Sequence, residues 1–315
     1  MNLLFIMDPI EKVKAHKDTS YALICAACQR GHKLFYTQHR DIAFDEGDVL
    51  TKAARVLPPD SPGGPLRTGE LKSVALGSMH AVFIRTDPPF DRRYFYLTLL
   101  MDLLPPHVQV INRAQSLRDW NEKLSSLLFP QIAPQTIVAR TVEDILDFQN
   151  KIAKVLTLKP IDGHGGRGIF FLEPNDRNRE SIIAAVTRDE SHWVIAQEYL
   201  DAAVEGDKRI LLVNGEPLGA ILRVHAEGKD LNNLDAGGTA VPADLTSREL
   251  DICKELKPHL IQKGLLFTGI DVIGEKLIEI NVTSPTGIQE MSRFLGRNLS
   301  IDVIAAVEKQ VESAH

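Results

Sequence analysis

The sequence predicts an α/β and α+β protein, in which an N-terminal doubly wound, mostly parallel sheet is followed by two α+β blocks. Up to about residue 120, short apolar runs of strand length alternate with segments of helical periodicity, which is typical of parallel strands joined by helices. Further along the chain, pairs of strand-like runs are separated by Asn214-Gly215 and by Gly274, which indicates tight hairpins. We therefore expect antiparallel strands in the second half of the molecule.

The composition favours a folded protein of the cytoplasm. The 315 residues are 44% hydrophobic and carry a formal net charge of -6, so the chain can build cores and offers no bulk attraction to nucleic acid. The N-terminal apolar run is too short for a signal peptide, and no run approaches the roughly 18 apolar residues that span a bilayer. Three cysteines give no disulfide framework. We expect a cytoplasmic location, with neither nucleic acid nor membrane as a partner.

The N-terminal block is predicted to hold four strands and two helices. Asp18 or Thr19 caps the first helix and Gly31 ends it, because short polar side chains bond the first free N–H groups and glycine adopts a left-handed turn. Residues 57–71, rich in proline and glycine, are expected to form a surface loop. The expected strands cover residues 3–8, 32–38, 80–87 and 108–113, and the expected helices cover residues 19–30 and 91–104.

Two cysteines in the first predicted helix allow two interpretations. Cys25 and Cys28 form a C-x-x-C pair, with His32 at metal-ligand spacing. The apolar residues around the pair follow helical spacing and Cys28 is among them, which favours simple packing of this helix in the interior. A structural zinc site requires four ligands, so metal or redox chemistry here is the lesser alternative.

The second block is predicted to begin with a helix over residues 116–130, and the third contains the two strands over residues 208–224. Ser116 is the expected N-cap of this helix and Pro130 ends it. Residues 208–224 are expected to form two strands joined by an Asn-Gly turn. The other expected strands cover residues 135–140, 155–160, 168–173 and 192–200, and the other expected helices cover residues 141–153, 178–189 and 246–264.

The segment KPIDGHGGRGIFF carries a glycine cluster between two expected strands. Gly163, Gly165 and Gly168 satisfy the G-x-G-x-x-G pattern of dinucleotide-binding folds, but that pattern precedes a helix, whereas IFF has strand composition. Glycines between two strands can instead form a flap whose N–H groups approach phosphate oxygens. Lys159 enters this glycine flap from the preceding strand and would face the same phosphates. A surface turn with an incidental lysine is the alternative.

The last predicted hairpin brings two carboxylates together. In the stretch LIEINVTSPTG, apolar residues alternate with Glu279 and Asn281, which gives a strand with one apolar and one polar face. If the connecting loop has three residues, Val272 pairs with Ile278 and Asp271 lies opposite Glu279, because this register keeps the apolar faces together.

Like charges in that position require a neutralising partner, since they otherwise destabilise the sheet. Asp271, Glu279 and Asn281 offer an all-oxygen ligand set, which suits Mg²⁺ shared with substrate phosphates. We call these three residues the metal shelf. An exposed hairpin edge with solvated charges is the alternative, because polar faces are ordinary in antiparallel sheets.

Lys123, Lys159, the glycine flap, the segment AQEYL and the metal shelf occur together in this chain. With these features it resembles the ATP-grasp superfamily and, within it, the bacterial glutathione synthetases. The resemblance implies a pre-ATP-grasp domain over residues 1–122 and a two-lobed ATP-grasp unit, with a central lobe over 123–203 and a C-terminal lobe over 204–315. Nearly the whole chain is covered by segments in that family's order: MDPI, KDTSYA, RTDPPFD, INRAQSLRDWNEKL, LKPIDGHGG, GDKRILLVNGEP, LDAGG and EINVTSPTGI.

The resemblance also implies roles for individual residues. Lys159 and Arg223 would act in catalysis, and two Mg²⁺ ions, with Mn²⁺ as a substitute, would bind Asp271, Glu279 and Asn281. The implied ATP contacts are Lys123, Lys159, Gly163, Gly165, Gly166, Gln197, Glu198, Tyr199, Leu200, Asp207 and Arg209. The implied peptide-substrate contacts are Lys17, Asp18, Ser20, Arg85, Asp87, Asn281, Ser284, Pro285 and Thr286.

One segment departs from the family pattern. The lid loop, which closes on the site and is expected over residues 225–238, carries arginines in this family near its middle and just after its AGG motif. This chain has Leu231 and Thr239 at those positions, although it keeps Arg223, and Lys229 is a partial substitute. The departure bears on the acceptor amine and leaves the ATP site intact. The expected glycine hinges of the lid are Gly228, Gly237 and Gly238.

The resemblance implies a reaction as well. ATP would phosphorylate the C-terminal carboxylate of γ-glutamylcysteine, and glycine would attack the acyl phosphate to give glutathione, ADP and phosphate. The family further implies a homo-oligomer, either a dimer or a tetramer. Two alternatives stay open, namely another ATP-grasp ligase with a different acceptor and an ATP-binding protein without turnover. A nicotinamide-dependent dehydrogenase would need a helix after Gly168.

Overall fold

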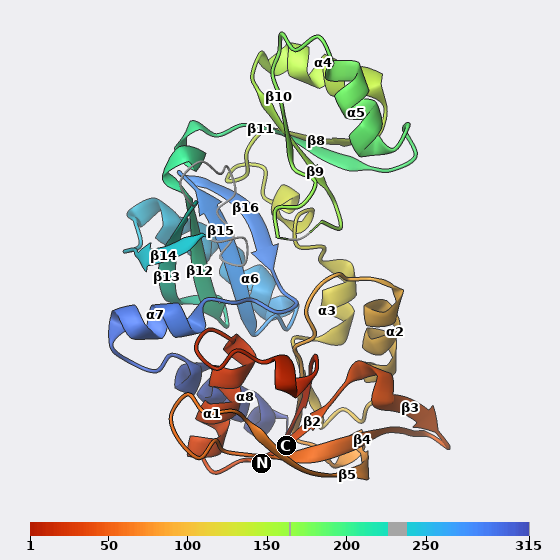
Figure 1. The fold of residues 1–315 in the computed structure, drawn as a ribbon, viewed down its shortest axis with the longest axis vertical. Helices are drawn as coiled ribbons and strands as arrows, with labels where there is room; N and C mark the ends of the chain where they lie inside the picture. Colours follow the sequence, from red (N-terminus) through yellow and green to blue (C-terminus); the bar gives the residue numbers. More distant parts are fainter. Residues whose placement is uncertain (164, 226–237, 315) are drawn as a thin grey trace.

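The computed structural model describes residues 1–163, 165–225 and 238–314 and contains three β-sheets (Figure 1). The N-terminal sheet lies at the lower end of that view, the central sheet at the upper end, and the C-terminal sheet between them. Each sheet falls within one of the three predicted domains, whose boundaries stay a prediction. Within the described ranges, no helix has the length and apolarity needed to cross a membrane.

The N-terminal sheet has seven strands: β1 (Asn2–Ile6), β2 (Lys33–Thr37), β3 (Ile42–Asp45), β4 (Asp48–Leu57), β5 (Arg67–Ala75), β6 (Ala81–Ile84) and β7 (Gln109–Ile111). Its order is β3-β4-β2-β1-β6-β7, with β5 along β4. The predicted parallel strands are present, because β2-β1-β6-β7 are parallel neighbours. Helices α1 (Thr19–Gln29) and α2 (Arg92–Met101) also lie where predicted, and Asp18 caps α1 by accepting a hydrogen bond from the Tyr21 N–H at 2.9 Å.

Strands β3, β4 and β5 extend this sheet with antiparallel pairs, which the sequence analysis did not predict. The predicted loop over residues 57–71 is correct for residues 58–66 and wrong beyond them, because Arg67 begins β5. The first seven residues of β5 are exposed, so the strand has no apolar face that periodicity could detect. Its pairing with β4 alone makes it a strand.

The predicted helix over residues 116–130 is also wrong. Helix α3 (Ala114–Asp119) ends before Trp120, and a separate 3₁₀ turn covers Ser125–Leu128. The Asn121 side chain accepts hydrogen bonds at 3.0 Å from two following backbone N–H groups, which favours a turn over a continuous helix. Ser116 therefore lies inside α3 and is not its cap. Other 3₁₀ turns cover Ile10–Lys12, His39–Asp41, Leu76–Ser78 and Asp201–Glu205.

The central lobe is a four-stranded sheet with two helices on one side (Figure 1). Its strand order is β10-β9-β11-β8, and every pair is antiparallel. All six elements were predicted. Their bounds are β8 (Thr136–Ala139), α4 (Val142–Ile152), β9 (Leu156–Pro160), β10 (Phe170–Leu172), α5 (Arg179–Thr187) and β11 (Val194–Glu198).

The C-terminal lobe is a five-stranded antiparallel sheet of order β14-β13-β12-β15-β16. Asn214 and Gly215, with φ of 49° and 74°, form the predicted tight turn between β12 and β13. A side chain at position 215 would place its Cβ 2.7 Å from the Lys257 Cα, so only glycine fits there. The bounds are β12 (Asp207–Val213), β13 (Glu216–Val224), β14 (Thr239–Pro242), α6 (Ser247–Gln262), β15 (Phe267–Ile273), β16 (Lys276–Asn281), α7 (Ile288–Leu295) and α8 (Ser300–Ser313).

The last hairpin confirms the predicted pair of carboxylates but not the predicted register. Asp271 lies opposite Glu279, whereas Val272 pairs with Leu277 and not with Ile278. The turn has two residues in place of three, and a bulge after Asp271 absorbs the difference. Ile278 is the extra residue of this bulge, and its side chain lines the cleft described below.

Buried apolar side chains form three clusters that do not follow the three sheets. One joins the N-terminal sheet to the C-terminal lobe through residues such as Leu4 and Ile270, and a second does the same through residues such as Phe5 and Val307. The third, around Ile145, belongs to the central lobe alone. The N-terminal sheet and the C-terminal lobe therefore share their cores, while the central lobe has its own.

Candidate active site

A cleft of about 870 Å³ lies where the central and C-terminal lobes face each other. Its size is that of an ordinary small-molecule site. Most of the predicted site residues line it, namely Asp87, Lys123, Lys159, Gly163, Gly165, Gly166, Gln197, Glu198, Tyr199, Leu200, Asp207, Arg209, Arg223, Asp271, Glu279, Asn281, Ser284 and Thr286. The fold thus brings together side chains from all three predicted domains.

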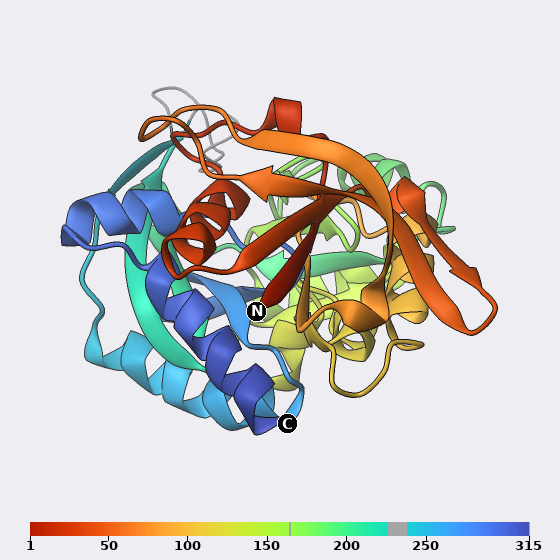
Figure 2. The same ribbon diagram turned by 90° about the horizontal axis from the view of Figure 1, so that it is seen from below.

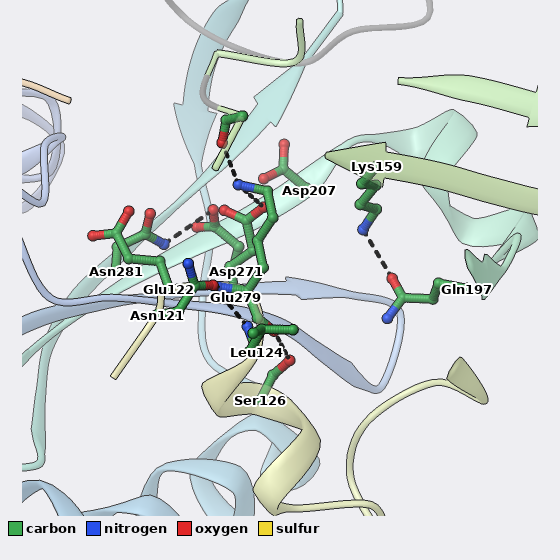
Figure 3. Close-up of polar contacts among 12 residues, drawn as sticks. Asn121, Glu122, Leu124, Ser126, Lys159, Gln197, Asp207, Asp271, Glu279 and Asn281 are labelled. Atoms are coloured by element: carbon green, nitrogen blue, oxygen red, sulfur yellow. Dashed lines mark hydrogen bonds and ion pairs between the residues drawn. The ribbon is translucent and has the colours of Figure 1, made fainter. Parts of the chain in front are cut away.

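Lys159 enters the cleft from β9. Its Nζ donates a hydrogen bond to Gln197 Oε1 at 2.8 Å (Figure 3). Gln197 Nε2 donates in turn to Thr136 Oγ1 at 2.9 Å. Burial lowers the pKa of Lys159 against the attraction of Glu279, and the positive charge of Lys123 acts in the same direction as burial. Lys159 forms no ion pair within the described part of the chain, so its positive charge is available to an anionic ligand.

Lys123 connects the glycine flap to the metal shelf. Its Nζ donates a hydrogen bond to the Gly163 carbonyl at 2.5 Å and lies 3.5 Å from Glu279 Oε1. The Asn121 side chain holds the turn that presents this lysine. The two lysines therefore reach the cleft from different segments, as a site for a polyphosphate requires.

Four charged side chains interlock on β12, β13 and β15. Both oxygens of Asp271 accept hydrogen bonds from Arg209, and Asp271 Oδ2 also lies 2.9 Å from Arg223 Nη2. Arg223 donates in turn to Asp207. We call Asp207, Arg209, Arg223 and Asp271 the charge quartet. All four are largely buried, and the two arginines neutralise the two carboxylates.

The quartet shifts the acidity of its members. Burial alone would raise the pKa of Asp271, but Arg209 and Arg223 outweigh it and hold that pKa below its usual range. Burial raises the pKa of Asp207 despite the attraction of Arg223. The pKa of Arg223 is raised, because its two carboxylate partners outweigh the effect of its burial. Asp271 is therefore an anion in this arrangement.

The metal shelf has the chemistry that a divalent cation needs. Asp271 and Glu279 face each other on β15 and β16, and Asn281 Nδ2 donates to Asp271 Oδ2 at 3.3 Å (Figure 3). This oxygen-rich set fits Mg²⁺. Asp271 is nevertheless occupied by the quartet, so binding of a cation to it requires the arginines to withdraw. Among the described residues, no group of three or more His, Cys, Asp or Glu is placed to hold a metal ion.

The residues predicted to face the peptide substrate divide into two groups. Asp87, Ser284 and Thr286 line the cleft. Arg85 lies behind them and donates to Ser20 Oγ and to the Pro285 carbonyl, both at 3.1 Å. Burial lowers the pKa of Arg85. Lys17, Asp18, Ser20, Arg85 and Pro285 are not among the residues that line the cleft.

Glu122 lines the cleft and was missed by the sequence analysis. Its Oε1 accepts hydrogen bonds from Val282 N at 2.9 Å, Thr283 N at 3.0 Å and Thr283 Oγ1 at 2.8 Å. Its own carbonyl accepts from Ile280 N at 2.8 Å. Glu122 thus fastens the segment of Lys123 to the end of β16, beside the metal shelf. Its place in NEKL, directly before the predicted lysine, was the available signal.

The other end of the cleft is less polar. The Tyr199 ring meets the Phe171 ring edge-on at 5.4 Å. The Glu198 carboxylate is already engaged, because it accepts from the Gln135 N–H at 2.9 Å and from Lys154 Nζ at 2.5 Å. Further lining residues that the sequence analysis did not identify are Val155, Ile169, Phe171, Ala203, Val204, Ile273 and Ile278. This end suits a flat, apolar group such as a nucleotide base.

The predicted lid loop lies largely outside the part of the chain that the structure describes. Of the lid loop, Gly228, Lys229, Leu231 and Gly237 fall outside the described residues. Thr239, at its end, is the first residue of β14 and is exposed.

Cys25 and Cys28 lie on α1 as half-buried thiols, and burial raises the pKa of both. Such thiols are less often in the reactive thiolate form. His32 is engaged with Glu308, at 2.6 Å, and with the N-terminal amine, at 3.3 Å.

The fold defines the class of protein. It is similar to that of D-cycloserine synthetase DcsG, with a TM-score of 0.70 and 14% identity over 98% of this chain and 99% of that one. It is also similar to the ATP-grasp ligase PsnB, with a TM-score of 0.63 and 14% identity over 98% of each chain. The molecule has the ATP-grasp fold.

Comparison of sequences identifies one family within the proteins of this fold. The family model of the prokaryotic glutathione synthetase N-terminal domain matches residues 1–118, and that of its ATP-grasp domain matches residues 122–296. Glutathione synthetase of Synechocystis sp. is 40% identical over 98% of this chain and 100% of its own length. That of Nitrosomonas europaea is 39% identical over 99% and 98%.

The chain therefore belongs to the prokaryotic glutathione synthetase family. It is an ATP-dependent carboxylate-amine ligase of the kind that forms glutathione. This confirms the resemblance that the sequence motifs indicated.

Proposed function

We propose that the cleft joins γ-glutamylcysteine to glycine through an acyl phosphate. The C-terminal carboxylate of γ-glutamylcysteine attacks the γ-phosphorus of ATP, and ADP leaves. The glycine amine then attacks the acyl carbon, phosphate leaves with the C–O bond electrons, and the amine gives up a proton. The observation that carries the proposal is the meeting of Lys123, Lys159 and the metal shelf in one cleft.

The chain's own groups supply charge and position, which is what phosphoryl transfer chiefly requires. Lys159 and Lys123 hold the ATP phosphates, with the backbone of Gly163, Gly165 and Gly166 above them. Arg223 leaves the quartet to stabilise the acyl phosphate and the oxyanion that follows. Asp271, Glu279 and Asn281 would hold the two Mg²⁺ or Mn²⁺ ions, which would supply positive charge that neutralises the phosphates.

The rest of the nucleotide lies toward the apolar end. Because the side chains of Gln197 and Glu198 are engaged with Lys159 and Lys154, the adenine is held mainly by the backbone of Tyr199 and Leu200. Asp207 and Arg209 lie near the sugar and phosphates.

The peptide substrate is held on the N-terminal side of the cleft. Arg85 braces the loop that carries Ser284, Pro285 and Thr286, together with Ser20. Asp87 faces the substrate directly, and Lys17 and Asp18 act from the start of α1. We further propose a cytoplasmic homo-oligomer, on the strength of the family.

The decisive experiment is phosphate release with ATP, Mg²⁺ and γ-glutamylcysteine, with and without glycine. The proposal predicts release that depends on both substrates and matches glutathione formed. Leu231 and Thr239 stand where the family has arginines, which favours testing a second candidate, a ligase with another acceptor amine. Release with a different amine and none with glycine would establish it. Nucleotide binding without any release would contradict both.

A further inference from the structure

The glycine flap carries one cationic side chain besides the backbone N–H groups that can approach a phosphate, the guanidinium of Arg167. Arg167 lies between Gly166 and Gly168, which both have a φ of 75°, and it is one of the residues that line the cleft. It is exposed, so its side chain is free to turn toward a ligand. The planar fork of N–H donors in a guanidinium matches the oxygens of a phosphate group.

The charge of Arg167 is not neutralised within the described part of the chain. Five lysines and arginines line the cleft there, namely Lys123, Lys159, Arg167, Arg209 and Arg223. The two arginines of the charge quartet are paired with its carboxylates, and Lys123 lies 3.5 Å from a carboxylate of the metal shelf. Among the described residues, Arg167 and Lys159 alone of the five have no ion-pair partner, so both can pair with an anionic ligand.

The folding of the flap places Arg167 at the phosphate end of the cleft. A Cβ at position 163 would lie 2.6 Å from Pro160 Cγ and 3.3 Å from the carbonyl oxygen of Arg167, so residues 163 and 167 are close neighbours. The Gly163 carbonyl accepts a hydrogen bond from Lys123 Nζ. Arg167 therefore stands beside the residue to which Lys123 is bonded, and the two cations can reach the same polyphosphate.

The flap is anchored at both ends in the central lobe. Strands β9 and β10 flank it as an antiparallel pair, and in Figure 1 the loop between them reaches down from the central sheet toward β16. Figure 2, seen from below, shows the green ribbons of the central lobe behind the red and orange N-terminal sheet. Because the central lobe has its own core, a substitution in the flap should leave the two shared cores intact.

We propose that Arg167 is a further catalytic residue, whose guanidinium donates hydrogen bonds to the terminal phosphoryl group of ATP. The inference rests on the proposed function, in which the bond from this phosphorus to the ADP oxygen breaks as a bond to the peptide carboxylate oxygen forms. Arg167 exchanges no proton in this step and supplies fixed positive charge to the oxygens of the transferred group. The alternative is a solvated arginine on a turn, with the flap acting through its backbone alone.

Nucleotide binding tests the contact directly. ADP lacks the terminal phosphoryl group, whereas the β,γ-imido analogue of ATP keeps it and is not cleaved. In calorimetry of the full-length protein with Mg²⁺, Arg167→Gln should raise the dissociation constant of the analogue about tenfold and that of ADP by less than about twofold. Arg167→Lys keeps the charge without the planar fork, so its effect on the analogue should be intermediate.

Arg177→Gln is the matched control. Arg177 is an exposed arginine of the same lobe, it follows β10, and it does not line the cleft. This substitution removes the same charge and should change neither dissociation constant. Arg167→Gln should also lower kcat/KM for ATP at least about tenfold, whereas Arg177→Gln should not. Both side chains are exposed, so both variants should keep the melting temperature of the unmodified protein.

Three results would overturn the proposal. Equal increases for ADP and the analogue would place Arg167 on another part of the nucleotide. A raised KM for the acceptor amine with unchanged nucleotide binding would assign Arg167 to the carboxylate of the acceptor. Binding and kcat/KM equal to those of Arg177→Gln would leave the flap with its backbone alone.

Failure of the proposed function is distinguishable from failure of this contact. If Arg167→Gln gave the expected change in binding while the unmodified protein released no phosphate with γ-glutamylcysteine and glycine, the contact with the terminal phosphoryl group would stand and the proposed reaction alone would fall.

Discussion

At the end of the cleft where the ATP phosphates are expected, the central lobe and the C-terminal lobe differ in how their charged side chains are paired. On the central lobe, Lys159 is half-buried, its hydrogen bond among the described residues goes to the amide of Gln197, and burial lowers its pKa. On the C-terminal lobe, the charge quartet contains two cations and two carboxylates that neutralise one another. Among the described residues, the central-lobe side therefore presents a cation without an ion-pair partner, whereas the charges of the C-terminal-lobe side are already paired.

This difference indicates which side of the cleft can bind its ligand without first breaking an ion pair. A half-buried cation without an ion-pair partner, such as Lys159, gains most from an incoming phosphate, because the ligand supplies the missing counter-charge. The quartet must instead exchange partners before Asp271 can bind a cation or Arg223 an anion. We expect the nucleotide to reach the lysines first and the quartet to rearrange afterwards.

Asp271→Asn should have the largest effect, since it removes the shared partner of both arginines. Breaking one side of a buried ion pair costs about 3–5 kcal/mol of unfolding free energy, and turnover should be lost with it. The pKa of Asp271 is lowered in the folded state, so its contribution is present above about pH 4 and is lost as the pH falls through the lowered pKa. Denaturant unfolding of both proteins from pH 7 to pH 3 should show the difference shrinking. A variant as stable as wild type at pH 7 would refute the quartet.

Glu279→Ala separates catalysis from stability. Glu279 lies opposite Asp271 but outside the quartet, and its side chain is 22% exposed. Turnover should fall at least about a thousandfold, because several kcal/mol of charge stabilisation are removed. The unfolding free energy should change by less than about 1 kcal/mol. Steady-state kinetics measure the turnover, and denaturant unfolding measures the unfolding free energy. Near-normal activity of the variant with Mg²⁺ would remove the metal shelf from the mechanism.

Lys159→Met tests the role of the positive charge on the central-lobe side of the cleft. Loss of one preorganised positive group should lower kcat/KM about a hundredfold. The free energy of unfolding should hold or rise below pH 9, because a half-buried charge is replaced by an apolar side chain.

The pH dependence of this variant follows from the lowered pKa of Lys159. Between that pKa and the ordinary value near 10.4, the unfolded chain binds more protons than the folded one, so wild-type stability rises with pH relative to the variant. Parallel unfolding curves at pH 7 and pH 10 would reveal it. If the unfolding free energy of wild type instead fell relative to that of the variant between pH 7 and pH 10, the pKa of Lys159 would be raised in the folded state, and a counter-charge would dominate over burial.

Glu122→Gln should have a smaller effect on activity, about tenfold, because this residue positions others. The amide keeps an acceptor but loses the charge that binds three donors. The expected change is a lower kcat and a higher Mg²⁺ requirement, with nucleotide affinity measured without metal unchanged. Thr283→Val removes one donor and should give a milder effect in the same direction.

Glu249→Gln is the matched control for Glu122. Glu249 also bonds a backbone N–H, at 2.8 Å, and Lys208, at 2.9 Å, but it lies outside the cleft lining. Its loss should lower stability and leave the Mg²⁺ requirement alone. If Glu122→Gln only lowered the melting temperature, its role would be structural.

The sequence allowed the site to be predicted where the chemistry is local. Alternation on one strand placed Glu279 and Asn281 on a polar face, and the hairpin placed Asp271 opposite, which the structure confirms. The exact pairing of Val272 was wrong, because a bulge costs little in backbone energy and leaves no clear signal in composition.

The missed features depend on contacts between distant segments. The pairing of Arg209 with Asp271 requires the register between β12 and β15, which no local pattern specifies. Glu122 finds its donors 160 residues further along the chain. β5 has no apolar face, so only its neighbour reveals it as a strand.

The distribution of the cores has a consequence for how the molecule comes apart. Because the N-terminal sheet and the C-terminal lobe share two clusters of buried side chains, heat or denaturant should melt them together, whereas the central lobe around Ile145 can lose its order separately. Three sheets thus make two cooperative units. Amide hydrogens of α4 and α5 should exchange with solvent as one group, at a rate unrelated to that of the remainder.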